Sequence, residues 1–232
     1  MAIILKTLEE IEIMRQTGKI LAKVMRDLEK EVKPGVTTKY LDKVAEDLVF
    51  KYGGKCSFKG HLDFPNCLCA SVNEIIVHGI PSDKKLDDGD IISLDLGVLY
   101  RGFHSDMAVT LGVGKINPEI SKLIETTKKA LEIGIKEIKI GKKIGAVSSS
   151  IQKYAETRGY GVVKELCGHG IGKNLHEDPQ VPNYGEKNEG AEIKEGMVIC
   201  LEPMFTIGDW RIRKAKDRYG FSSRDNSLSA HF

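Results

Sequence analysis

Two aspartates lie on either side of a short break between alternating apolar segments. Asp95 precedes the break at Tyr100-Arg101-Gly102 and Asp106 follows it, and both flanks have the period of two that strands require. A turn at Tyr100-Arg101 would make the two aspartates direct cross-strand neighbours, with Cβ atoms about 4.5–5.5 Å apart. Carboxylates this close repel one another unless a cation lies between them, and converging oxygen ligands suit a divalent metal.

The two faces of this predicted hairpin differ in composition. The pleat places small and polar residues on one face, namely Ser93, Asp95, Gly97, His104, Asp106, Ala108 and Thr110. It places apolar residues on the other, namely Ile92, Leu94, Leu96, Met107, Val109 and Leu111. The apolar back face favours a buried metal site over the alternative, in which both aspartates lie on a solvated surface.

Four further residues have the chemistry to complete such a site. His169 lies between two glycines, which leave its imidazole room to approach another group, and His176 follows seven residues later. A lone histidine is more often structural, but this pair is less easily dismissed. Glu202 follows the apolar run Met197–Leu201 and precedes a proline, and a buried carboxylate there needs a partner. His78 ends another predicted strand, where it either faces water or donates a hydrogen bond to a substrate amide.

Helices and strands alternate along the chain that must position these residues. A capping box at Thr7 and Glu10 begins a long amphipathic helix that ends at Lys33-Pro34-Gly35. Further helices are expected from about Thr38 to Gly53-Gly54, from Asn117-Pro118 to about Ile140 and from about Ala146 to Arg158. Strands are expected over 67–77, 90–113 and 197–207, with a glycine-rich loop from 159 to the last of them.

A faint internal repeat relates the two parts of the chain. At an offset of 106 residues, Lys33 matches Lys139 and Gly35 matches Gly141, and in each copy two helices are separated by a glycine break. We therefore expect a single domain over 1–232, built from two similar halves of about 1–113 and 114–232 with a site between them.

Composition restricts the class of protein. The chain has 232 residues, 29% of them charged, and a formal net charge of +2, which is too small to indicate a dedicated nucleic-acid binder. It contains no apolar run of about 18 residues and no signal peptide, so we expect neither a transmembrane helix nor export. Five cysteines is an odd number, which predicts reduced thiols and a cytoplasmic location. The basic run Arg211–Arg218 is expected to be a solvated loop beside the site, or alternatively a ribosome contact.

Four motifs together resemble the type I methionine aminopeptidases in their short prokaryotic form. They are NEIIVHGIP, SLDLGVLYRGFHSD, CGHGIGKNLHEDPQVPNYG and LEPMFTIG, and the resemblance runs from about residue 5 to the C-terminus. It implies the pita-bread fold, an α/β (α+β) arrangement of two pseudo-twofold halves with a central antiparallel sheet flanked by helices. It also implies a monomer that acts on nascent polypeptide N-termini, removing the initiator methionine when the second residue is small.

The same resemblance implies roles for individual residues. Asp95 corresponds to a ligand of one metal ion, Asp106 to a ligand bridging two, and His169 and Glu202 to the remaining ligands of the first site. The two ions would be Co, Mn, Fe or Zn, and Glu202 would move the proton of the attacking water. Counterparts of His78 and His176 contact the substrate. The methionine pocket would be lined by Cys69, Phe64, His61, Leu175 and Tyr219. The spacing Cys67-Leu-Cys69 alone would suggest zinc, but no second cysteine pair supports that interpretation.

The sequence departs from the family pattern at one ligand. The family's last ligand, a glutamate that bridges both metals, follows a segment matching Ser227–Phe232, and the sequence stops at Phe232. Either the protein is longer, or its second site keeps only Asp95 and Asp106, and we expect weakened metal binding and low activity for the sequence as written. Two other functions remain open, an X-Pro-cleaving peptidase of the same fold and a binding module that has lost its metals.

Overall fold

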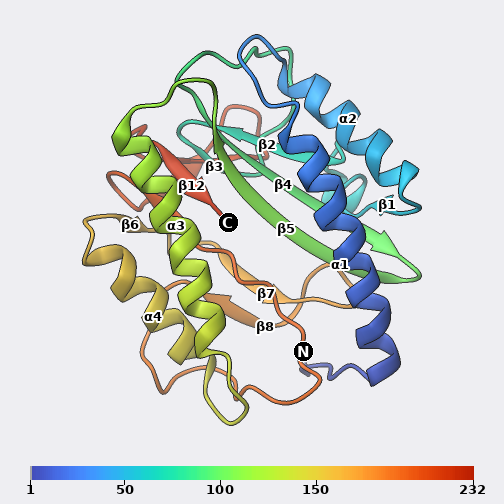
Figure 1. Ribbon diagram of the computed structural model, residues 1–232. Coiled ribbons are helices and arrows are strands. Elements are labelled where there is room, and N and C mark those ends of the chain that lie inside the picture. The colour runs from blue at the N-terminus through green and yellow to red at the C-terminus, as the bar shows by residue number, and fades with distance from the viewer. Residues whose placement is uncertain (1) are drawn as a thin grey trace.

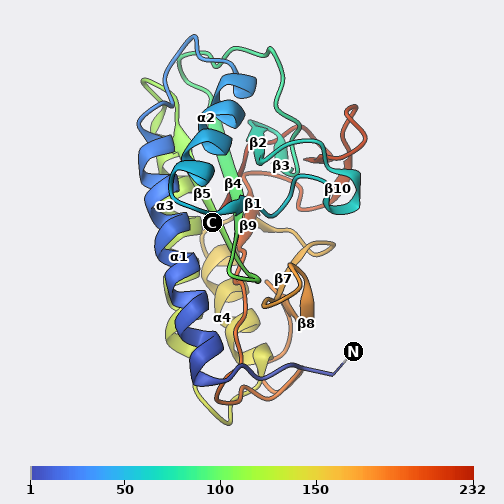
Figure 2. The same ribbon diagram turned by 90° about the vertical axis from the view of Figure 1, so that its right-hand side faces the viewer.

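The structure is a computed structural model that describes residues 2–232, and its helices and strands form separate layers (Figures 1 and 2). Four α-helices are present: α1 (Leu8–Glu29), α2 (Thr38–Lys51), α3 (Pro118–Glu137) and α4 (Ile144–Glu156). A short 3-10 helix, η1, spans His61–Asp63. The longer strands are β2 (Leu68–Val72), β4 (Ile91–Tyr100), β5 (Phe103–Gly112), β7 (Cys167–Gly170) and β8 (Glu177–Pro182). The shorter ones are β1 (Lys55–Cys56), β3 (Ile75–Val77), β6 (Gly161–Val162), β9 (Met204–Thr206), β10 (Ile212–Lys214), β11 (Phe221–Ser223) and β12 (Ser229–His231). No helix within these residues has the length and hydropathy that a membrane crossing needs.

The expected helices are confirmed, and side-chain caps set three of their starts. The Thr7 hydroxyl accepts from the backbone of Glu10, whose side chain accepts from Thr7 in return, so the predicted capping box begins α1. Thr37 caps α2 and Asn117 caps α3, each with its side chain accepting one backbone hydrogen bond. All four helices end two to four residues earlier than expected, at Glu29, Lys51, Glu137 and Glu156.

The central sheet has the order β1-β4-β2, with β5 on the other edge of β4. In the β4–β5 hairpin, Asp95 lies opposite Ala108 and Asp106 lies opposite Gly97. The predicted register was therefore wrong by two residues, and the aspartates are diagonal neighbours on the predicted face. The turn lies at Arg101-Gly102, where both residues have positive φ, as the two-residue turns that match strand twist require, and glycine favours that conformation.

Other strands differ from the expectation for related reasons. The predicted strand over 67–77 is divided by a turn at Asn73-Glu74, where Asn73 has φ 57°. The region after Gly159 is not a loop, because β6, β7 and β8 form there despite glycines and prolines that disfavour strands. Conversely, only Met204–Thr206 of the predicted strand over 197–207 is regular, and Glu202 lies on an irregular segment before it.

Two separate apolar clusters hold the helix pairs to the sheets. The first joins α1 and α2 to the back face of β4, and includes Leu21, Leu41, Leu94 and Leu96. The second lies under α3 and α4, and includes Leu123, Val147, Ile151 and Phe205. Figure 1 shows the two helix pairs on either side of the central strands, with the C-terminal end of the described chain between them.

The expectation that all thiols are reduced is wrong for two cysteines. Cys56 and Cys67 form a disulfide, and Cys69, Cys167 and Cys200 are free. Cys56 lies on β1 and Cys67 directly precedes β2, and both strands pair with the same edge of β4. This proximity is a consequence of strand pairing, which neither cysteine parity nor chain length reveals. Cys67 and Cys69 pack in different apolar clusters.

Candidate metal centre

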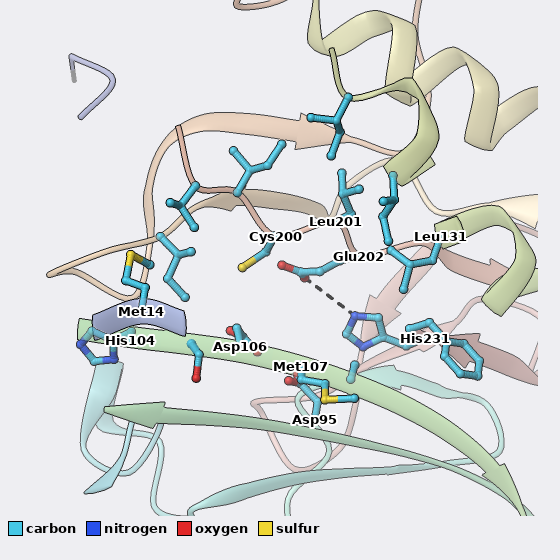
Figure 3. Close-up of a pocket in the computed structure, with 18 of the residues that line it drawn as sticks. Met14, Asp95, His104, Asp106, Met107, Leu131, Cys200, Leu201, Glu202 and His231 are labelled. Atoms are coloured by element: carbon cyan, nitrogen blue, oxygen red, sulfur yellow. Dashed lines mark ion pairs between the residues drawn. The ribbon is translucent and has the colours of Figure 1, made fainter. Parts of the chain in front are cut away.

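The candidate ligands converge from three strands and one irregular segment. Asp95 on β4 and Asp106 on β5 face Glu202 and Cys200, which project from the irregular segment after residue 197 (Figure 3). Nε2 of His169, on β7, lies 3.2 Å from Oε1 of Glu202 and 3.9 Å from Oδ2 of Asp106. Asp95, Asp106, Cys200 and Glu202 border a cavity of about 480 Å³ between α1, β5, α3 and the segment 198–202. All four predicted metal ligands are thus brought together, although the hairpin register and the strand predicted before Glu202 were both wrong.

Glycines on β7 allow this approach. A Cβ on Gly168 would lie 2.2 Å from the carbonyl oxygen of Cys200, and a Cβ on Gly170 would lie 2.2 Å from that of Asp178. The backbone nitrogen of Cys200 donates to the carbonyl of His169 at 2.7 Å, which holds the Glu202 segment against β7. The glycines flanking His169 therefore serve close backbone packing, which places the imidazole beside Glu202.

We expect Gly168→Ala to destabilise the metal-free protein by about 1–3 kcal/mol, the usual cost of overpacking. The added methyl group pushes the Cys200 backbone away from β7 and with it Glu202, so metal affinity also falls. Gly18→Ala is the control, since a Cβ there meets nothing within 4 Å, and in a helix interior it should add about 0.5–1 kcal/mol. Urea unfolding and metal titration measure both effects; equal stability of the two variants would contradict this account.

Hydrogen bonding fixes the tautomer of His169. Its Nδ1 lies 2.7 Å from the carbonyl oxygen of Gly170, and because a carbonyl only accepts, Nδ1 carries the proton. Nε2 then presents a lone pair toward Glu202 and Asp106 when the ring is neutral. This arrangement, with the second ring nitrogen bonded to a backbone carbonyl, is usual for metal-ligating histidines.

The electrostatics of the cluster indicate a missing positive charge. Burial, with Asp106 and Glu202 nearby, raises the pKa of Asp95 well above its usual value. Burial and Glu202 also raise the pKa of Asp106 to about 7. Burial opposes ionisation of Glu202, but His169 and His231 outweigh it and lower the pKa of Glu202. Burial alone would lower the pKa of His169, but the neighbouring Glu202 outweighs burial, so the pKa of His169 lies above its usual value. Oε1 of Glu202 is buried and has no hydrogen-bond partner within residues 2–232.

This donor set fits a divalent cation. Carboxylate oxygens and an imidazole nitrogen are ligands that divalent transition metals accept, and an unsatisfied buried carboxylate oxygen is what such an ion would satisfy. A bound cation would also remove the repulsion that keeps Asp95 and Asp106 protonated.

A second group of predicted residues lies beside the ligands. His61 Nε2 is 3.2 Å from His176 Nδ1, and the His176 ring lies 4.5 Å from the His169 ring. Partial burial and the neighbouring histidines lower the pKa of His176 to about 4, so its ring is neutral at neutral pH. His78 follows β3 with φ 57°, and burial lowers its pKa as well.

The predicted pocket walls also come together. Phe64, Cys69 and Leu175 belong to one buried cluster, in which Met14, Phe58, Phe103 and Ile171 also take part. The ring of Tyr219 packs edge-on against Phe64, with ring centroids 5.7 Å apart, and its hydroxyl donates to the carbonyl of Asp63. These residues form an apolar wall beside the histidines.

Three residues of this region were not predicted from the sequence as site residues. Ligand atoms of Cys200, His169 and Glu202 all lie within 4.8 Å of one another, so the Cys200 thiol belongs to the cluster. His231 is buried on β12, with Nε2 3.8 Å from Oε2 of Glu202 (Figure 3). His104 borders the cavity and its Nδ1 lies 2.8 Å from the Ser57 hydroxyl. The spacing of Cys200 two residues before Glu202 was the available signal, since alternate residues of an extended segment share a side.

Comparisons with known proteins agree with this arrangement. Residues 12–225 match Metallopeptidase family M24. A methionine aminopeptidase from Clostridium acetobutylicum is 46% identical over 231 residues, which make up 99% of this chain and 92% of that protein. The crystal structure of a methionine aminopeptidase from Thermotoga maritima is similar with a TM-score of 0.98 and 39% identity, over 100% of this chain and 93% of that one. Prolidase from Pyrococcus furiosus gives a TM-score of 0.78 and 27% identity, and the match covers 98% of this chain but 61% of the prolidase.

The chain therefore belongs to metallopeptidase family M24, whose pita-bread fold the mixed helices and antiparallel sheets reproduce. Within that family, the relatives that match nearly the whole chain at 44–46% identity are methionine aminopeptidases, which confirms the resemblance found in the sequence.

Proposed function

We propose that the chain is a divalent-metal aminopeptidase that removes the initiator methionine from nascent proteins whose second residue is small. The observation that carries this proposal is the position of the carboxylate and histidine cluster beside a buried apolar cluster, in a chain whose relatives over nearly its whole length are methionine aminopeptidases. An X-Pro peptidase is less well supported, because the similarity to prolidase is lower in both sequence and structure.

Asp95, Asp106, His169 and Glu202 would hold the metal. Two ions are proposed, the first held by Asp106, His169 and Glu202 and the second by Asp95 and Asp106. Their mixed oxygen and nitrogen donors admit Co, Mn, Fe or Zn, among which availability normally decides. When bound, such ions act as Lewis acids that acidify water and polarise the scissile carbonyl.

The remaining chemistry belongs to the side chains around the metal. Glu202 has a lowered pKa and is therefore ionised at neutral pH, so it can accept the proton of the attacking water and deliver it to the leaving amine. His176 is neutral, and its Nδ1 lies beside His61, which leaves Nε2 to donate to the oxygen that becomes negative in the transition state. His78, also with a lowered pKa, would donate to the substrate amide.

The methionine side chain would pack against the apolar wall described above. Cys69, Phe64, His61, Leu175 and Tyr219 are proposed to line this pocket. A long unbranched thioether suits a pocket of aromatic and aliphatic groups.

The same proposal has consequences for the domain organisation of the chain and for its location in the cell. We propose a single catalytic domain over 1–232 whose halves, about 1–113 and 114–232, each contribute one helix pair, and a monomer that works in the cytoplasm. The disulfide between Cys56 and Cys67 is unusual for that compartment, where thiols are kept reduced. The exposed basic segment 211–218 would meet ribosomal phosphates only transiently, a contact that should weaken strongly as salt rises.

The decisive experiment is methionine release from a Met-Ala-Ser peptide as Mn(II) or Co(II) is titrated into metal-free protein, with an X-Pro peptide alongside. We expect metal-dependent cleavage of the first peptide alone. Cleavage of the X-Pro peptide alone would transfer the chain to the prolidase-like enzymes. Metal binding without cleavage of either would indicate a binding module.

A further inference from the structure

A buried ion pair joins the N-terminal arm to the loop that carries His176. Nζ of Lys6 lies 2.6 Å from Oε2 of Glu177, and the two side chains are 2% and 4% exposed. In the other lysine and arginine ion pairs of residues 2–232, every side chain is at least 20% exposed. The metal chemistry proposed above uses neither residue of this pair.

The surrounding backbone is built around this pair. The second carboxylate oxygen of Glu177 accepts from the backbone nitrogen of Asn174 at 3.1 Å, so the carboxylate spans the loop from within. A Cβ on Gly172 would lie 2.6 Å from Cε of Lys6 and 2.7 Å from Oε1 of Glu177. Lys6 is itself fixed, since its backbone nitrogen donates to Gly196 at 2.7 Å and its ammonium to Ile4 at 3.0 Å.

The loop held in this way ends at the edge of the proposed active site. His176 directly precedes Glu177, and Leu175 packs in the apolar cluster of the pocket. His176 is partly exposed to solvent, and its ring contacts are with His61 and His169. Its position therefore depends on the backbone of residues 172–177. The Glu177 carboxylate holds this segment together through its hydrogen bond with the backbone of Asn174.

Stability alone is a poor explanation for the pair. Removing two charges from water offsets most of their attraction, and apolar residues of similar size often hold a structure equally well. An ion pair with a further backbone hydrogen bond also fixes the orientation of the carboxylate, because the carboxylate must keep one orientation to satisfy both donors.

We propose that Lys6 and Glu177 are positioning residues that hold His176 in line with His169 and the scissile carbonyl. The proposal rests on the catalytic role proposed for His176. The ammonium of Lys6 orients the Glu177 carboxylate, the carboxylate fixes Asn174 and the turn of the loop, and the loop presents the imidazole.

Four variants test the proposal. Lys6→Met and Glu177→Gln each remove one charge, whereas Lys6→Met/Glu177→Leu removes both and leaves no unpaired buried charge, so it is expected to fold even where a single variant does not. Lys173→Met is the control, because Lys173 in the same loop forms an exposed ion pair with Glu10 of α1 at 3.2 Å. The first readout is the NMR signal of the His176 ring in metal-free protein, assigned with His176→Gln. The second is the kinetics of Met-Ala-Ser cleavage.

We expect the double variant to shift the His176 ring signals and to lower kcat about 10–100-fold, as loss of a supporting residue around a metal site typically does, with little change in KM. Lys173→Met should change neither. Unchanged His176 signals in the double variant would overturn the proposal whatever the activity. If the chain cleaves no methionine peptide, the proposed function fails, but the NMR comparison still decides whether the ion pair positions His176.

Discussion

Replacement of Glu202 by glutamine is expected to lower kcat/KM for methionine release about 10²–10⁴-fold, the usual contribution of a general acid–base group. Glutamine keeps the shape of the side chain and the hydrogen bond that the Glu202 carbonyl accepts from Asn183. It cannot accept the proton of the attacking water, and it is a poorer metal ligand than a carboxylate. Steady-state kinetics on Met-Ala-Ser with saturating Co(II) measure the effect, with metal content determined in parallel.

The matched control is Glu165→Gln, which makes the same change at an exposed position whose carboxylate accepts from the Lys164 backbone. Its kinetics should equal those of the unmodified chain. Loss of bound metal in Glu202→Gln would assign the effect to ligation, and retained metal with a low rate would assign it to proton transfer. Full activity of Glu202→Gln would remove Glu202 from the mechanism.

Helices and strand faces could be predicted because their signals are local. Thr7 with Glu10, and Asn117 with the following proline, mark helix starts through contacts within one turn. Alternation along the β4–β5 hairpin assigned Asp95 and Asp106 to the same face, which the structure confirms. A period of two fixes the face of a residue but not the partner opposite it, so the register depended on locating the turn, and that prediction was wrong.

Features that depend on contacts between distant segments could not be predicted in the same way. β7 and β8 contain glycines and prolines, and they form because they pair with each other and with the segment before Glu202. Cys56 and Cys67 meet because two short strands share one edge of β4. Glu202 was predicted as a site residue from its motif and from the cost of an unpaired buried carboxylate. Neither observation depends on the strand that was wrongly predicted before it.

The cluster of ligands is a local conflict between stability and function. Without metal, three carboxylates lie close together in a buried place, and the protein compensates by protonating Asp95 and Asp106 and by pairing Glu202 with His169. The site is therefore arranged for a cation at a cost to the metal-free fold, which is typical of functional sites. This cost has a sign and a pH range that can be measured.

Replacement of Asp106 by asparagine is expected to stabilise the metal-free protein at pH 8 and to abolish its stabilisation by metal. The pKa of Asp106 is about 7 in the folded protein, against an ordinary value of 3.8. The folded state thus binds more protons at Asp106 than the unfolded state between these values, so the contribution of Asp106 to metal-free stability is greatest below about pH 4 and falls as the pH rises toward 7. The loss reaches up to about 4 kcal/mol at pH 8, since each pKa unit corresponds to 1.36 kcal/mol.

Asparagine has nearly the same shape and does not ionise, so this loss is absent from the variant. We expect Asp106→Asn to be more stable than the unmodified chain at pH 8 and about equally stable at or below pH 4, measured by urea unfolding in the presence of a chelator. Metal has the opposite effect, because it binds the ionised carboxylate and displaces its proton. The unmodified chain should therefore gain stability with added Mn(II) or Co(II), more at pH 8 than at pH 6, and the variant should gain little at either.

Asp83→Asn, at an exposed position, is the control and should change neither property. A variant that is less stable at pH 8 without metal would show that Asp106 is not held under electrostatic strain, and one that metal still stabilises would show that Asp106 is not a principal ligand.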